Sequence, residues 1–257
     1  MDNFKRLVEI IAILRGPNGC PWDKKQDHKS LKPYIIEEAY EVIEAIEAGD
    51  DSKLSEELGD LLTQIIMHAQ LAKERGAFDI DTVTKMITDK LVERHPHVFL
   101  SRADLTPEEV LHNWERIKLE KSKDPEYSVL RGVPQALPAL LKAFRVQEKV
   151  GRHGFDWRNP ADVIAKVKEE IAEFEEALVS GEKAKQEHEL GDLLFSLVNL
   201  GRHLEMQPEE ALNGTIRRFT RRFQYIEQKL RENGKTLTDS NLEEMDKYWE
   251  EAKNIMP

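Results

Sequence analysis

Closely spaced pairs of carboxylates are the residues of this sequence best suited to chemistry. Glu38 and Glu41 are three positions apart, and so are Glu57 and Asp60. Side chains three or four positions apart share one face of an α-helix, so each pair projects together. Gly49 predicts a short turn between the two helices, which then lie antiparallel with the pairs face to face. The pattern predicts four converging carboxylates.

The same acidic pattern occurs a second time, 132 residues later. Its members are Glu170, Glu173, Glu189 and Asp192, and the intervening glycine recurs as Gly181. The flanking segments match at a shift of 135 residues, which pairs Trp22 with Trp157 and Trp114 with Trp249. So many matches in the same order indicate a duplicated domain.

Carboxylates gathered in a small space repel one another, and a hard divalent cation relieves that repulsion. Mg²⁺, with Mn²⁺ as the alternative, prefers oxygen ligands and keeps positions for water and substrate phosphates. The alternative interpretation is a solvated face of charged helices, but repetition at identical spacing favours metal ligation. Ferritin-like di-iron chemistry needs Glu-x-x-His pairs, and the one such pair, Glu109–His112, lies outside both acidic sets. Metal-assisted hydrolysis of a phosphoanhydride is the chemistry that remains.

The elements that must position these carboxylates are helices. Apolar residues recur at helical spacing along most of the chain, as at Phe4, Leu7, Ile11 and Leu14. Thr106 begins a capping-box sequence, which predicts another helix start. In the second half we expect helices over about 138–150, 160–179, 183–204, 208–232 and 240–254. No stretch shows the alternation of a strand, so the expected fold class is all-α.

Prolines and glycines interrupt the helical pattern between about Ser122 and Pro138. We therefore expect an N-terminal domain over residues 1–121, a linker over 122–137 and a C-terminal domain over 138–257.

Composition excludes several classes of function. The chain has 257 residues and a formal net charge of −11, which disfavours binding to a nucleic-acid polymer. Its longest apolar runs, such as 10–14, are far shorter than the roughly 20 residues of a membrane helix. The single cysteine, Cys20, excludes an intramolecular disulfide. We expect a cytoplasmic protein without a signal peptide.

The EExxE…ExxD pattern on a helical hairpin resembles the signature of the all-α nucleoside triphosphate pyrophosphohydrolases. With Gly-Cys-Pro-Trp-Asp at 19–23 and Glu-Leu-Gly-Asp-Leu-Leu-Phe at 189–195, nearly the whole chain is similar to the two-domain bacterial MazG family. The resemblance implies Mg²⁺-dependent cleavage of an NTP or dNTP, such as ATP, to the monophosphate and pyrophosphate. It also implies broad specificity and a homodimer of helical bundles. In the second half it makes Glu170, Glu173, Glu189 and Asp192 the metal ligands and catalytic residues.

Cationic residues distinguish the two copies. In the second half, four of them can bind phosphate oxygens: Lys166, Lys185, Arg218 and Arg222. At the 132-residue shift their counterparts are Tyr34, Lys53, Met86 and Lys90, so the first half keeps two of the four. The resemblance favours the second copy as the catalytic one and places Trp249 at the nucleobase. The alternatives are a solvated basic face for the arginines and a packing role for Trp249.

Several roles stay open at this level. Trp157 is expected to anchor a loop and His188 to be a bystander beside Glu189. Asn199 shares a helical face with Asp192 and could hydrogen-bond the substrate, but packing between helices is favoured. A non-catalytic helical adaptor and a nucleotide sensor that binds without cleaving are the competing functions. The sequence does not identify the carboxylate that acts as base, the phosphorus that is attacked or the preferred nucleobase.

Overall fold

The computed structural model describes residues 2–121 and 128–256. Within these residues all regular structure is helical and none is β-strand, as predicted. The chain divides into two compact units, Met1–Lys121 and Ser122–Pro257. Part of the expected linker, 122–127, lies outside the described residues, and residues 128–137 form turns and bends. None of the helices in the described part is long and apolar enough to cross a membrane.

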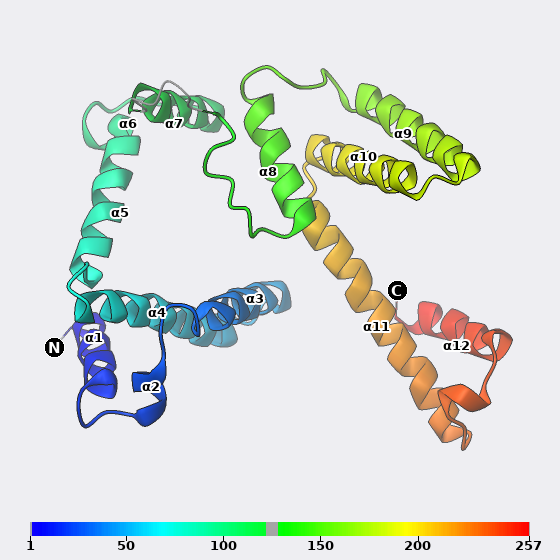
Figure 1. The fold of residues 1–257 in the computed structure, drawn as a ribbon, viewed down its shortest axis with the longest axis horizontal. Helices are drawn as coiled ribbons and strands as arrows, with labels where there is room; N and C mark the ends of the chain where they lie inside the picture. Colours follow the sequence, from blue (N-terminus) through cyan, green and yellow to red (C-terminus); the bar gives the residue numbers. More distant parts are fainter. Residues whose placement is uncertain (1, 122–127, 257) are drawn as a thin grey trace. The chain divides into compact units, whose positions relative to one another are not determined.

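The first unit is built around a long helical hairpin (Figure 1). Its helices are α1 (Asn3–Arg15), α2 (Pro21–Lys25), α3 (Lys32–Ala48), α4 (Asp51–Glu74), α5 (Ile80–Arg94), α6 (Pro96–Phe99) and α7 (Pro107–Lys121). Gly49 adopts a left-handed conformation (φ 65°) that ends α3, and Asp50 caps α4 by accepting from the Lys53 amide. A buried cluster holds α1 and the segment before α3 against α4; it contains Ile11, Leu31, Ile66 and Met67.

The second unit repeats the hairpin. Its helices are α8 (Ala139–Gly151), α9 (Pro160–Ser180), α10 (Lys183–His203), α11 (Pro208–Glu232), the 3₁₀ turn η1 (Leu237–Asp239) and α12 (Leu242–Ile255). Gly181 ends α9 in the left-handed conformation (φ 72°), the counterpart of Gly49 in α3. Helix α8 packs on α10 and α11, and α12 packs back along α11 (Figure 1). The buried side chains include Val163, Val198, Ile226 and Leu230.

The predicted capping box at the start of α7 is confirmed. The Thr106 amide donates to Glu109 Oε2 at 2.8 Å, and the Glu109 amide donates to Thr106 Oγ1 at 3.3 Å. The short helices α2 and α6 and the turn η1 were not expected, because segments of three to five residues are too short to show a 3.6-residue period.

Candidate functional site

Each hairpin brings three of its four predicted carboxylates together. In the second unit, oxygens of Glu170, Glu173 and Glu189 all lie within 4.8 Å of one another. The first unit has the same arrangement at Glu38, Glu41 and Glu57. The fourth member of each set, Asp192 or Asp60, lies outside this group. The convergence predicted from spacing is therefore present in both copies, with the aspartate set apart.

Asp192 is paired with a histidine that we did not expect to contribute. His188 Nε2 lies 3.3 Å from Asp192 Oδ2, one helical turn away on α10. His188 thus contacts Asp192 on the exposed face of α10.

Glu170 is the most deeply buried carboxylate of its cluster, with 5% of its surface exposed. Lys166 Nζ binds its Oε1 at 2.8 Å, from one helical turn earlier on α9. The other oxygen, Oε2, is buried and accepts no hydrogen bond from any described residue. Buried carboxylate oxygens are costly to leave without a partner. This oxygen is available to a ligand that carries positive charge or a donor.

Electrostatics at the clusters follow from burial and like charge. Burial raises the pKa of Glu173, and the negative charge of Glu170 raises it further. In the first unit, burial likewise raises the pKa of Glu38 and of Glu57, with contributions from neighbouring carboxylates. Hydrogen bonds to Glu169 and Glu170 raise the pKa of Lys166 above its ordinary value. The clusters are strained by negative charge, and added positive charge would stabilise them.

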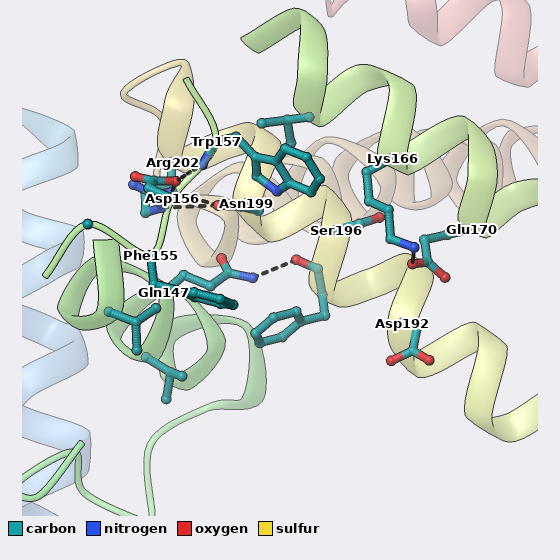
Figure 2. Close-up of a pocket in the computed structure, with 15 residues that line it drawn as sticks. Gln147, Phe155, Asp156, Trp157, Lys166, Glu170, Asp192, Ser196, Asn199 and Arg202 are labelled. Carbon is teal, nitrogen blue, oxygen red and sulfur yellow. Dashed lines mark hydrogen bonds and ion pairs between the residues drawn. The ribbon is translucent and has the colours of Figure 1, made fainter. Parts of the chain in front are cut away.

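A cavity of ≈ 580 Å³ opens beside the second cluster. Lys166, Glu170 and Asp192 line one end of it, while Gln147, Asn199 and Arg202 line the other (Figure 2). Aromatic side chains complete its wall, from the loop after α8 and from α10; they are Phe155, Trp157 and Phe195. The cavity joins a charged end to an apolar and amide-lined end, a composition typical of small-molecule sites.

A network of hydrogen bonds fixes the amide-lined end. Arg202 donates to Asn199 Oδ1 from Nε at 3.1 Å and from Nη2 at 2.8 Å. Its Nη2 also binds Asp156, which accepts a further bond from His203 Nε2 at 2.9 Å. Burial raises the pKa of Asp156, but the hydrogen bonds from Arg202 and His203 outweigh burial and hold that pKa below its ordinary value. A Cβ on Gly151 would lie 2.8 Å from Asp156 Oδ2, so the glycine lets this loop approach α8.

Comparison with known proteins assigns both halves to pyrophosphohydrolase domains. Residues 26–99 match the MazG nucleotide pyrophosphohydrolase domain, and residues 140–219 match the phosphoribosyl-ATP pyrophosphohydrolase family. The chain is 44% identical to the Thermotoga maritima nucleoside triphosphate pyrophosphohydrolase/pyrophosphatase MazG, over 97% of this chain and 95% of that protein. The chain belongs to the MazG family.

Two further relatives differ in how much of their length the match to this MazG-family chain covers. The Escherichia coli K12 nucleoside triphosphate pyrophosphohydrolase is 42% identical over 98% of each chain. The uncharacterized Bacillus subtilis protein YabN is 49% identical over 97% of this chain, but the match spans 51% of YabN. The two-unit MazG arrangement therefore occurs both as nearly the whole of a protein and as part of a longer one.

Three residues predicted to bind substrate lie away from the cavity of this MazG-family unit. Arg218 is exposed on α11 and donates to Thr215 Oγ1 at 3.0 Å. Arg222 donates to the Met256 carbonyl from Nε at 3.2 Å and from Nη2 at 3.0 Å, and its guanidinium lies 5.8 Å from the ring centroid of Trp249. Trp249 also contacts Phe219, with ring centroids 5.1 Å apart. Arg222 and Trp249 thus hold the end of α12 against α11.

The two predicted lysines have different surroundings. Lys166 lines the cavity and contacts Glu170, as its spacing predicts. Lys185 is exposed on α10, one turn before Glu189. In its first-unit counterpart, Lys53, the Nζ atom lies 3.9 Å from Glu57 Oε1.

The remaining cavity residues were missed or given other roles by sequence reasoning. Trp157 lines the cavity, although loop anchoring was expected of it, and Asn199 lines it too, as its alternative role in substrate binding requires. Gln147 and Arg202 were not predicted, because a single amide or guanidinium on a helix is compatible with many roles. A comparison of the two repeats could have indicated Gln147 and Asn199, since Ala12 (shift 135) and Met67 (shift 132) stand at their positions in the first unit.

Proposed function

We propose that the second unit hydrolyses nucleoside triphosphates to the monophosphate and pyrophosphate. The observation that carries the proposal is a cavity lined by Lys166, Glu170 and Asp192 at one end and by aromatic and amide side chains at the other. A triphosphate and a nucleobase need those two environments in one site. The names of the Thermotoga maritima and Escherichia coli relatives support the same activity.

We propose that Glu170, Glu173, Glu189 and Asp192 hold Mg²⁺, for which Mn²⁺ can substitute. The donor set fits, since carboxylate oxygens are the ligands Mg²⁺ prefers and the buried Glu170 Oε2 lacks a partner among the described residues. When bound, the ion neutralises phosphate charge and lowers the pKa of water.

The chain's own residues bind and orient the substrate. Lys166, fixed by its ion pair with Glu170, and Lys185 present ammonium groups to phosphate oxygens. Trp157 and Phe195 offer ring faces to the base. Trp249, which the family resemblance places at the nucleobase, stays part of the proposed substrate site. One carboxylate of the cluster accepts a proton from the attacking water. Arg218 and Arg222 on α11 also bind phosphate oxygens in this proposal.

The first unit is, in this proposal, the weak or inactive copy. It keeps the acidic cluster, but its core fills the place of the amide-lined end: Met67, the counterpart of Asn199, is 4% exposed. Tyr34 replaces Lys166 and packs edge-on against Trp22, with ring centroids 5.9 Å apart. The first unit therefore lacks the amide of Asn199 and two of the four proposed phosphate-binding cations, since Tyr34 and Met86 stand at the positions of Lys166 and Arg218.

We further propose broad specificity and a homodimer. Aromatic ring faces accept every base, which supports hydrolysis of several NTPs and dNTPs, ATP included. Large apolar side chains remain exposed on the hairpin and α11, among them Ile171 (42%), Leu194 (46%) and Phe219 (54%). Such surfaces mark contacts between proteins, and a second copy of this chain is the proposed partner. Light scattering at micromolar concentration would give twice the chain mass.

Product analysis tests the proposed activity against the alternatives. The full chain is incubated with each NTP and dNTP in Mg²⁺, and orthophosphate and pyrophosphate are measured separately. Pyrophosphate with monophosphate, and no orthophosphate, is the expected result. Thermal stabilisation by nucleotide without any product would identify a sensor instead. The absence of both turnover and stabilisation would favour an adaptor.

A further inference from the structure

Gln147 is a buried amide in the cavity wall that the acidic motif does not include. It lies on α8 with 5% of its surface exposed. Its Nε2 donates to the backbone carbonyl of Phe195 on α10 at 2.8 Å (Figure 2). This bond fixes which way the amide faces, because the carbonyl of Phe195 accepts from the nitrogen only.

The oxygen of this amide, unlike its nitrogen, has no hydrogen-bond partner among residues 2–121 and 128–256. Gln147 Oε1 is buried and accepts no hydrogen bond within the described part of the chain. A buried acceptor without a donor destabilises the folded protein. Because Gln147 lines the cavity, a bound molecule with an N–H group can supply the missing donor.

Asn199 presents the complementary group in the same cavity. Two hydrogen bonds from Arg202 occupy its Oδ1, and Asp156 holds Arg202 in place. The orientation of the Asn199 amide is thereby fixed, and its NH₂ group is left to donate. The amide-lined end offers one fixed acceptor and one fixed donor.

We infer that Gln147 contacts the nucleobase, its Oε1 accepting a hydrogen bond from an exocyclic amino or ring N–H group while Asn199 donates to an adjacent base acceptor. The inference rests on the proposed function and names a residue that binds the base of its substrate. The Watson–Crick edge of each common base carries a donor beside an acceptor. This pair therefore selects molecules that carry such an edge and discriminates weakly among the common bases.

Substrate analogues without the N–H group test this contact directly. Kinetics are measured on the full chain with ATP and purine riboside 5′-triphosphate, which lacks the amino group, and with UTP and N3-methyl-UTP. In the wild type, kcat/KM falls about tenfold for each analogue, as expected for one hydrogen bond. In Gln147→Met, ATP and UTP fall to the level of their analogues, so both ratios approach one. The loss lies mainly in KM.

A matched variant controls for a general effect of losing an amide. Gln186 Nε2 donates to the Ala177 carbonyl at 3.3 Å, and Gln186 lies outside the cavity lining. Gln186→Met should keep the wild-type ratios. Equal rates for substrate and analogue in the wild type would overturn the inference even if Gln147→Met fails to fold. Wild-type ratios that persist in Gln147→Met would overturn it too. If the wild type released pyrophosphate from no nucleotide, the proposed function itself would fail.

Discussion

Lys166 Nζ lies 2.8 Å from Glu170 Oε1 and leaves Glu170 Oε2 buried without a partner among the described residues. One contact therefore links the predicted cation to the predicted metal ligand, and it leaves half of that carboxylate available. In the first unit Tyr34 stands at the position of Lys166, so the hairpins differ at this point although their acidic clusters match.

Removing Lys166 should weaken both folding and turnover. In Lys166→Met the buried Glu170 loses its ion pair, so we expect the second unit to lose about 1–3 kcal/mol of stability without divalent ions. Mg²⁺ should recover part of this loss, and kcat/KM should fall at least tenfold. Thermal melts in chelator and in Mg²⁺, with pyrophosphate assays, measure these effects. Lys53→Met is the control, because Lys53 lies 3.9 Å from Glu57 and is 46% exposed; an equal loss there would contradict the account.

Alanine variants of Arg218 and Arg222 should distinguish a role in substrate binding, measured by KM, from a role in packing, measured by the melting temperature. Arg222→Ala removes two bonds to the Met256 carbonyl and the contact with Trp249, so its melting temperature should fall. Arg218→Ala, at an exposed position, should keep the wild-type melting temperature. If both residues bind phosphate as predicted, KM rises in both variants. An unchanged KM in Arg218→Ala would remove that residue from the site.

The repeat, the paired hairpins and the acidic clusters could be predicted from the sequence, because spacing along a helix fixes which side chains share a face. The contact of Lys166 with the acidic cluster could be predicted too, from its position one turn before Glu170. The role of Gln147 could not be predicted, because it depends on a buried oxygen that no periodic pattern indicates. For Trp249 the family resemblance places the ring at the nucleobase, and its contacts with Phe219 and Arg222 are visible only in the folded unit.

Asp156 should make stability depend on pH. Its pKa is held below the ordinary value of 3.8, so the carboxylate adds stability above that pH. This contribution is lost as the pH falls through the lowered pKa. Asp156→Asn should therefore melt below the wild type at pH 7, and the difference should shrink towards pH 3.

An exposed aspartate provides the comparison. Asp89, paired with Lys85 and 63% exposed, belongs to a surface ion pair of the kind that contributes little. Asp89→Asn should melt close to the wild type at both pH values. A difference for Asp156→Asn that stays constant from pH 7 to pH 3 would show that its ionisation is not involved.

The most direct test of the account compares the same substitution in the two copies. Glu170→Gln and Glu38→Gln occupy positions related by the 132-residue shift and are each made in the full chain. With ATP and Mg²⁺, we predict that Glu170→Gln lowers the rate of pyrophosphate release by about two to three orders of magnitude. Glu38→Gln should keep most of the wild-type rate. A Glu170→Gln variant that releases pyrophosphate at the wild-type rate, or a Glu38→Gln variant that loses it, would contradict the placement of catalysis in the second unit.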